Sequence, residues 1–188
     1  MSKSLRLLMI ASLVTAVAAG CKNEKGEVSE YESGAAQPAF AFTVYPGAKY
    51  LAQLTDLTKQ AHKVVVPNEK EPPAMAIYDS EAPIEQVAEW YAKSYGFNTV
   101  APDATNNLSA AKPPAFYRSG DLNADLVSIK PVLDKMNLKV DIAKAQGKYK
   151  GANIDPRPNR PRVTLERPYF DVTTQQVVDR TLILMARE

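Results

Sequence analysis

The feature that most limits how this chain can fold is an uncharged apolar run close to its N-terminus. Residues 7–19 are mostly apolar and carry no charge, and two cations, Lys3 and Arg6, precede them. A helix needs roughly 20 apolar residues to cross the hydrocarbon core of a bilayer, so this run is too short for a permanent anchor. The pattern is typical of a secretory signal peptide. We therefore expect this segment to be removed and to take no part in the fold.

The residues that follow the run are Ala18, Ala19, Gly20 and Cys21, and Cys21 is the only cysteine of the chain. Small residues before a cysteine at the end of an export signal resemble the lipobox of bacterial lipoproteins. In that family a diacylglyceryl group is attached to the cysteine sulfur, a dedicated signal peptidase cuts just before it, and the new amino group is often acylated. The resemblance implies cleavage after Gly20 and a lipid on Cys21, although Ala18 stands where the family most often has leucine.

Lipidation would tether the protein to a membrane without spanning it. Each buried methylene contributes roughly 0.8 kcal/mol, and two or more acyl chains hold a protein stably at a bilayer. The residue after the cysteine is Lys22 and not aspartate, which resembles the pattern of outer-membrane lipoproteins that face the periplasm. The alternatives are an ordinary secreted protein with a free cysteine near its N-terminus, or an apolar N-terminal tail that is not cleaved.

The composition changes after the cysteine. Residues 22–39 carry charges of both signs and almost no large apolar side chain, so they cannot offset the entropy lost on ordering. We therefore predict a signal peptide at 1–20, a flexible tether at 21–39 and one globular domain at 40–188. A flexible coil of about 18 residues would let the domain reach on the order of 25 Å from the membrane.

Apolar periodicity within the domain predicts both helices and strands. Helical spacing appears in 51–61, 83–95 and 122–136, although Pro131 inside the third segment predicts a kink or two short helices. Short apolar or alternating runs predict strands at 40–44, 63–67, 74–78, 97–100, 138–142, 163–165 and 181–186. This irregular order indicates an α+β fold with a mainly antiparallel sheet and two or three helices packed on one face.

Composition limits the chemistry of the domain. A single histidine and a single cysteine exclude the usual Cys/His zinc sites. A formal charge of +2 is too weak to indicate nucleic-acid binding, which needs a concentrated basic face. The chain also lacks the glycine-rich phosphate loops and the Gly-x-Ser-x-Gly motif. We therefore expect no metal, no cofactor and no nucleic-acid partner.

An acidic motif and the single histidine have simpler interpretations than calcium binding and catalysis. Residues 121–125 resemble the start of an EF-hand loop, but Leu126 and Val132 stand where that loop needs glycine and glutamate. Asp121 is better interpreted as a helix cap. His62 lies beside a run of valines, where a structural role is usual, and a general base in a hydrolase is its alternative.

The most basic segment of the domain lies near the C-terminus. Residues 144–167 carry an excess of five positive charges, and 155–162 alternate proline with arginine. Such a strip should be extended and close to polyproline II. Arginine makes bidentate contacts with phosphate or carboxylate, so the candidate residues for binding an anion or a partner are Arg157, Arg160, Arg162 and Arg167. A rigid solvated loop is the alternative.

These observations predict a lipid-anchored envelope protein with a non-catalytic binding or scaffolding domain. Its partners would be the membrane, through the lipid on Cys21, and an envelope polyanion or protein. The alternative is a small envelope hydrolase that uses acidic residues and His62. A buried cluster of titratable groups in a cleft would favour the hydrolase, whereas an open groove would favour binding.

Substitution of the cysteine tests the anchor. Cys21→Ser removes the sulfur that would carry the lipid, so the variant is expected to lose membrane association. Cell fractionation of the wild-type and variant proteins measures this loss. Variant protein that still pellets with membranes to the same extent as the wild type would contradict lipidation.

Overall fold

The computed structural model describes residues 42–69, 71–102 and 113–187. The predicted signal peptide, Cys21 and the predicted tether lie outside the described residues. The described helices are α2 (Ala52–Val65), α3 (Ile84–Ser94), α4 (Leu122–Lys135) and a 3₁₀ turn η2 (Ile142–Lys144). The strands are β1 (Lys49–Tyr50), β2 (Met75–Ser80), β3 (Ala115–Asp121), β4 (Lys148–Ile154), β5 (Arg162–Arg167), β6 (Tyr169–Asp171), β7 (Gln176–Val178) and β8 (Thr181–Ala186).

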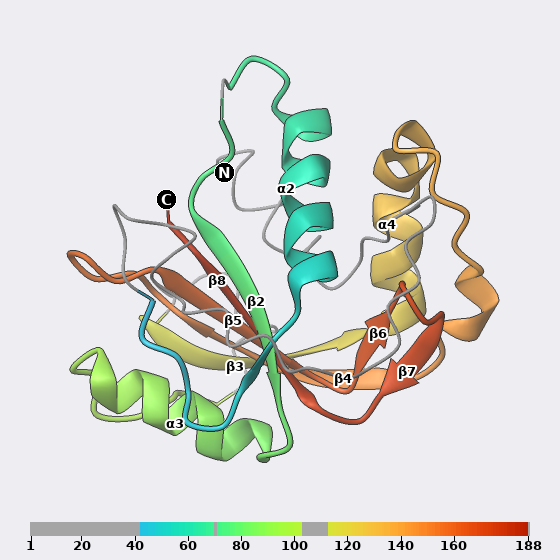
Figure 1. Ribbon diagram of the computed structural model, residues 1–188. Coiled ribbons are helices and arrows are strands. Elements are labelled where there is room, and N and C mark those ends of the chain that lie inside the picture. Colours follow the sequence, from blue (N-terminus) through green and yellow to red (C-terminus); the bar gives the residue numbers. More distant parts are fainter. Residues whose placement is uncertain (1–41, 70, 103–112, 188) are drawn as a thin grey trace.

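The described strands form one large sheet and one small hairpin. The six-stranded sheet of the described residues has the order β1-β2-β8-β5-β4-β3, and each neighbouring pair in it is antiparallel. β6 and β7 pair separately. With helices and strands in similar proportion, this arrangement confirms the predicted α+β class and the mainly antiparallel sheet (Figure 1).

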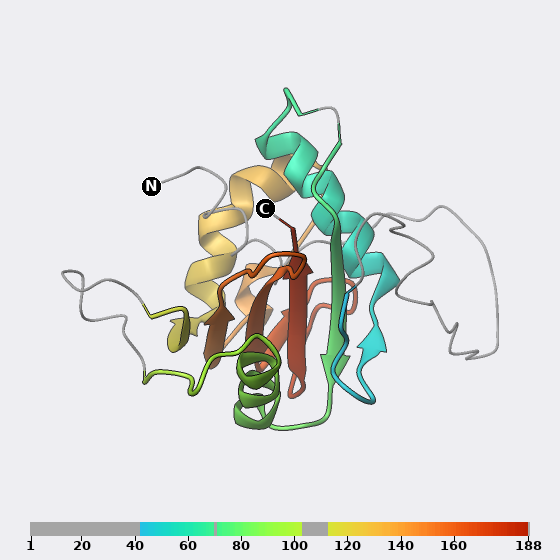
Figure 2. The same ribbon diagram turned by 90° about the vertical axis from the view of Figure 1, so that its left-hand side faces the viewer.

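Helices cover both faces of the sheet. In β8, Leu182 and Leu184 belong to a core cluster with residues of α2 and α4, whereas Ile183 and Met185 belong to a cluster with residues of α3. Figures 1 and 2 show α2 and α4 on one side of the sheet and α3 on the other. The predicted one-sided arrangement therefore holds for α2 and α4 but not for α3. The reason is that successive side chains of a strand point to opposite faces, and every residue of β8 is buried.

Helix α3 follows its predicted pattern closely. Ile84, Val87, Ala88 and Tyr91 form a buried stripe against the sheet. Gly96 follows the helix with φ of 78°, a conformation that glycine adopts without a steric penalty. The prediction of a helix between Pro83 and this glycine is confirmed.

Helix α4 runs through Pro131 without a break, so the predicted alternative of two short helices is wrong. Asp121 caps it, since its Oδ1 accepts a hydrogen bond of 2.9 Å from the Ala124 N–H. Proline lacks the N–H that would bond to the carbonyl four residues earlier, here that of Val127. Val127 is 51% exposed and Pro131 is also exposed, so the missing bond lies on the side of the helix that water reaches, which lowers its cost.

Two predicted strands are replaced by other structure. Residues 63–65 continue α2, and the Val66 N–H still bonds to the His62 carbonyl, because packing of the helix outweighs the weak strand preference of valine. Residues 138–142 alternate in polarity but form no strand. Leu138 is buried, and Val140, in the irregular segment that follows, and Ile142, at the start of η2, pack against the same core.

The strands predicted at the start of the domain and after α3 are also absent from the described residues. Residues 42–44 and 97–100 form no strand, whereas Ala101 makes a parallel bridge to Phe116 at the outer edge of β3. Residues 45–48 form a turn, with a bond of 3.1 Å from the Ala48 N–H to the Tyr45 carbonyl.

The arginine-proline strip is a hairpin end, not an extended segment. Arg157 and Arg160 pair across the chain between β4 and β5, and the Arg160 N–H bonds to the Arg157 carbonyl over 2.9 Å. Asn159 turns the chain with φ of 62°, a conformation that asparagine tolerates better than most residues. The polyproline II prediction is therefore wrong, because pairing of the flanking strands outweighs the local preference of the prolines.

Several tyrosine rings lie in the core with their hydroxyls hydrogen-bonded. The Tyr91 hydroxyl accepts from the Tyr45 N–H over 3.1 Å, and the Tyr95 hydroxyl donates to the Pro161 carbonyl over 2.8 Å. Burial raises the pKa of Tyr91 and Tyr95 well above the ordinary value. Burial, with the nearby Tyr50, raises the pKa of Tyr78 to about 12.

These raised pKa values predict a steep loss of stability in alkali. The unfolded chain loses its tyrosine protons near pH 10, whereas Tyr78 in the folded chain keeps its proton to about pH 12. The folded state therefore binds more protons than the unfolded state in this window, so stability that is complete below about pH 10 falls as the pH rises. Tyrosinate absorbance and circular dichroism should change together in an alkaline titration, and Tyr78→Phe should flatten the fall. Ionisation of these tyrosines near pH 10 with the fold intact would contradict the prediction.

Candidate functional site

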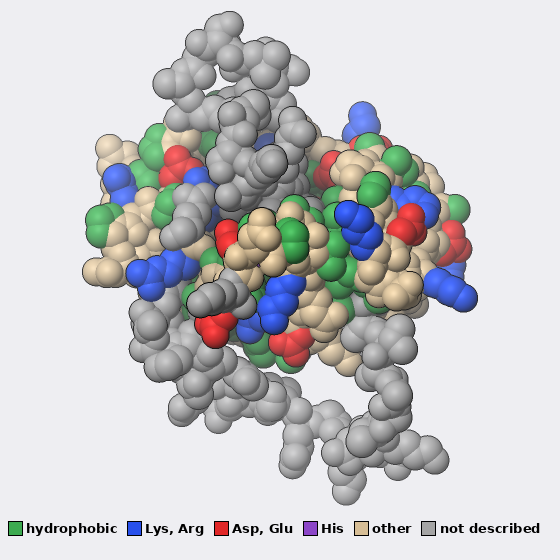
Figure 3. All heavy atoms as spheres, turned by 90° about the horizontal axis from the view of Figure 1, so that it is seen from above, with side chains coloured by type: hydrophobic (Ala, Val, Ile, Leu, Met, Phe, Trp, Pro, Cys, Tyr) green, Lys and Arg blue, Asp and Glu red, His purple; other side chains and the backbone are tan. Residues whose placement is uncertain are grey.

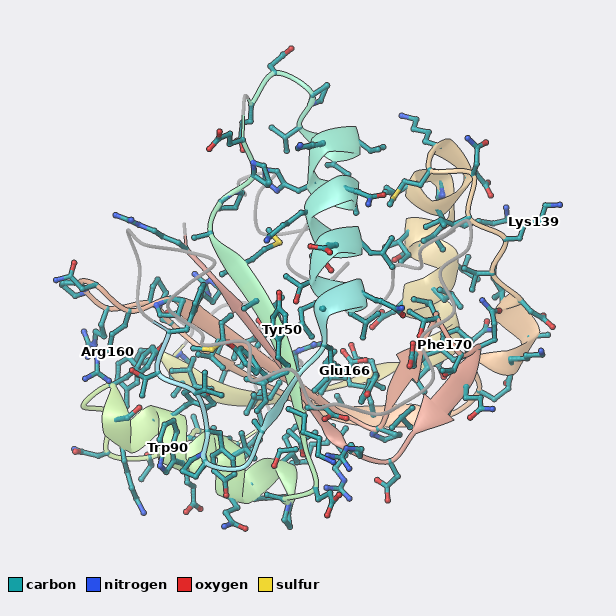
Figure 4. The ribbon with its side chains drawn as sticks, viewed as in Figure 1. Tyr50, Trp90, Lys139, Arg160, Glu166 and Phe170 are labelled. Carbon is teal, nitrogen blue, oxygen red and sulfur yellow. The ribbon has the colours of Figure 1, made fainter. Side chains whose placement is uncertain are left out.

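A cluster of ionisable side chains is buried on the face of the sheet that α2 and α4 cover. Arg118 on β3 and Glu166 on β5 flank Gly151 of β4, and Arg118 Nη2 lies 3.4 Å from Glu166 Oε2. Arg118 also donates to the Tyr149 hydroxyl, which donates to the Asp125 carboxylate on α4. Figure 4 shows Glu166 between the sheet and the two helices. The cluster therefore links α4 to three strands.

Two glycines make room for this cluster. A Cβ atom on Gly151 would lie 2.8 Å from Arg118 Cγ, and one on Gly120 would lie 2.3 Å from the Tyr149 ring. Neither distance is compatible with real packing, so a side chain at either position would displace the arginine or the tyrosine.

The buried cluster has the character of a structural network. Arg118 is 7% exposed and Glu166 is 2% exposed, which leaves almost no surface for a substrate. Burial and the carboxylate of Glu166 raise the pKa of Tyr149, so its hydroxyl remains a hydrogen-bond donor. The partners within the cluster neutralise and bond to one another, as buried charges require.

His62 is not brought together with the acidic residues of α3. It lies buried on α2, and its Nε2 is 2.6 Å from the Glu69 carboxylate in the segment after that helix. Glu85 and Glu89 lie on α3, across the sheet, where they pair with lysines. This geometry gives the hydrolase alternative no shared cleft for these residues.

The residues that resemble an EF-hand start serve the helix instead. Asp121 caps α4 and Asp125 accepts the bond from Tyr149. Within residues 42–69, 71–102 and 113–187, no group of three or more His, Cys, Asp and Glu side chains could hold a metal ion.

Arg157 and Arg160 lie at the hairpin tip and contact the C-terminal end of α3. Arg157 Nε donates to the Tyr95 carbonyl over 3.3 Å, and Arg160 Nη1 donates to the Ser94 carbonyl. Their guanidinium carbons lie 4.3 Å from the centre of the Phe97 ring and 5.2 Å from that of Tyr95, respectively. Both residues are exposed. The negative end of the helix and the two rings thus hold both guanidinium groups in place, and Figure 4 shows Arg160 beside the end of α3.

The other two candidate arginines do not complete a single site. Arg162 lies 2.6 Å from Asp155, whereas Arg167 bonds to Asp179 over 2.9 Å and to the carbonyls of Glu81 and Ala82. They stand at opposite ends of β5, which extends roughly 3.3 Å per residue. Of the four predicted arginines, the hairpin tip therefore presents Arg157 and Arg160 together, and Arg167 belongs to another part of the surface.

Sequence reasoning missed an open hollow at the β3 edge of the sheet. Two adjoining concavities of about 360 and 610 Å³ share Val100 and Tyr117. The first is also lined by Glu89, Ala92, Lys93, Asn98 and Thr99, and the second by Pro102, Arg118, Ser119 and Lys150. The adjacent aromatic residues Phe116 and Tyr117 could have indicated this edge strand, but no pattern links Tyr117 to Lys150 or to the segment after α3.

Charges of both signs are interspersed on the side of the molecule that α2 and α4 cover, opposite α3. Figure 3 looks down on α2 and α4, and over α4 it shows basic side chains next to acidic ones. One such pair is Lys130 and Asp134, 2.7 Å apart. The visible surface over α4 therefore does not present a single sign of charge.

No family model, curated protein or solved structure matches this chain. Among the described helices, none has the length and apolar character needed to cross a bilayer. Functional interpretation therefore rests on the residues and their geometry.

The structural role of the buried cluster can be tested by denaturation. Arg118→Met should lower the free energy of unfolding by about 3 kcal/mol, because it leaves the Glu166 carboxylate buried without the arginine. The double variant Arg118→Met, Glu166→Leu should regain most of this loss, since both buried charges are removed. Urea denaturation of the mature chain measures both values.

The matched control is Lys130→Met, which breaks an exposed pair. It should change the free energy of unfolding by less than about 1 kcal/mol. An Arg118→Met protein as stable as this control would show that the cluster does not support the fold.

Proposed function

We propose that this protein is a lipid-anchored protein of the bacterial cell envelope whose folded domain binds an anionic envelope polymer without catalysis. The export signal and the lipobox-like residues up to Cys21 support the anchor. The outer membrane, on its periplasmic side, is the proposed location because Lys22 follows the cysteine. The observation that carries the binding role is the pair of exposed, oriented guanidinium groups at the β4–β5 hairpin tip.

The hairpin geometry suits recognition of carboxylate or phosphate. A guanidinium group has five N–H donors in a planar fork. Arg157 uses one nitrogen for the Tyr95 carbonyl and Arg160 uses one for the Ser94 carbonyl, so further donors remain on each. Stacking on Phe97 and Tyr95 limits their motion, which lowers the entropy lost when an anion binds.

The contacts of the buried ionisable groups favour binding over catalysis. Arg118 pairs with Glu166, Asp79 lies 2.6 Å from Arg180, and His62 lies 2.6 Å from Glu69. Each of these pairs joins two structural elements of the domain. His62, Asp79 and Arg118 are also buried, so a substrate has little access to them.

The test compares binding to isolated envelope fragments at increasing salt concentration. A Cys21→Ser background removes the contribution of the lipid to sedimentation. Arg157→Gln with Arg160→Gln should weaken binding and flatten its salt dependence, because two cationic contacts to the polymer are lost.

Lys135→Gln with Lys139→Gln is the matched control, since it removes two exposed charges at the far end of α4. This control should bind as the parent does. Equal binding by the hairpin variant and the parent would refute the proposed role of the hairpin. Equal losses of binding in both double variants would also refute it, because net charge and not the hairpin geometry would then explain the binding.

A further inference from the structure

We infer that the hollow beside Tyr117 is a binding subsite for a neutral saccharide. This inference goes beyond the proposed function, because the lining of the hollow does not include Arg157 or Arg160. Its volumes of about 360 and 610 Å³ fall within the usual range of roughly 300–1,000 Å³ for small-ligand sites.

The packing of α3 leaves the aromatic ring of Tyr117 accessible. α3 lies over β4 and β5, toward the middle of the sheet. β3 is the edge strand, so Tyr117 extends beyond the helix and stays partly exposed. Lys150 Nζ lies over the Tyr117 ring, 4.3 Å from its centre, so the ammonium group occupies part of one ring face and limits the motion of the ring. Tyr117 borders both concavities, and the lining of the first does not include Lys150, so this side of the ring offers a surface for the C–H groups of a pyranose.

The charged groups of the hollow are paired with one another or with close neighbours. Lys93 lies 3.9 Å from Glu89, and Lys150 lies 2.7 Å from Glu85. The bond from Lys150 lowers the pKa of Glu85, so this pair stays ionised at neutral pH. Arg118 pairs with Glu166. Since each of these cations faces a carboxylate, the hollow has little net charge to attract an ion of either sign.

The remaining lining combines apolar and hydrogen-bonding groups. Val100 and Pro102 are apolar, whereas Asn98 and Thr99 are exposed and carry amide and hydroxyl groups that both donate and accept. Burial raises the pKa of Tyr117, so its phenol is also a donor. A sugar presents C–H faces and hydroxyls together and matches this mixture. An acyl chain would instead need an enclosed apolar cavity.

The test titrates the mature full chain, held in detergent, with two neutral probes, the tetramer of N-acetylglucosamine and maltotetraose. Isothermal titration calorimetry should detect binding of at least one probe to the wild type. Tyr117→Ala should weaken this binding by about tenfold or more, since the stacking surface is lost. Tyr117→Phe should stay within about threefold of the wild type, since the ring remains.

Tyr50→Ala is the matched control. Tyr50 lies in the same cross-strand row as Tyr117, at the opposite edge of the sheet, and is also partly exposed. This variant should bind the probe as the wild type does. Thr99→Trp, at an exposed rim position, should block binding without a change in the core, so the inference stays testable if Tyr117→Ala does not fold.

The inference fails if the wild type binds neither probe, or if folded Tyr117→Ala and Thr99→Trp keep the wild-type affinity. It also fails if only acidic oligosaccharides bind. The hairpin variant Arg157→Gln with Arg160→Gln should bind the neutral probe normally, so failure of the hairpin proposal and failure of this one can be distinguished.

Discussion

The burial of the central strands on both faces is the constraint on which the rest of the structure depends. In β8 every residue is buried, and its side chains alternate between two separate core clusters. A strand of this kind cannot leave one face to water, because half of its apolar side chains would then lose their burial. Helices on both sides are the result: α2 and α4 cover one face, α3 covers the other, and β1 and β3 are the outer strands of the sheet.

The same two-sided packing explains why charges are buried beside α4. Arg118 and Glu166 lie on the face of the sheet that α2 and α4 cover, on either side of Gly151, and Tyr149 connects Arg118 to Asp125 on α4. Buried pairs of this kind add little net stability over apolar residues, but they penalise any arrangement that separates them. A shift of β3 by one residue would move Arg118 to the opposite face. The cluster therefore favours one register of the outer strands and one position of α4.

Surface features with a functional interpretation gather around the end of α3. Arg157 stacks on Phe97 at the hairpin, and Asn98, which follows Phe97 in the chain, lines the hollow beside Tyr117. Both surfaces arise because α3 ends before the edge of the sheet and its last carbonyls meet the β4–β5 hairpin. Taken together, the proposed cationic pair and the proposed neutral subsite would suit a partner that combines acidic groups with sugars.

Local patterns in the sequence determined the elements whose periodicity is long or whose strand is wholly apolar. Helix α3, the cap at Asp121 and the buried strand β8 follow from spacing, capping and apolar runs, and the anchor at Cys21 is an inference from sequence alone. Only the tertiary structure decided that 63–65 are helical and that the arginine strip is a hairpin. Only the fold could bring Tyr117, Lys150 and the segment after α3 to one hollow. Such contacts depend on strand order and on which face a helix covers, and local patterns carry neither.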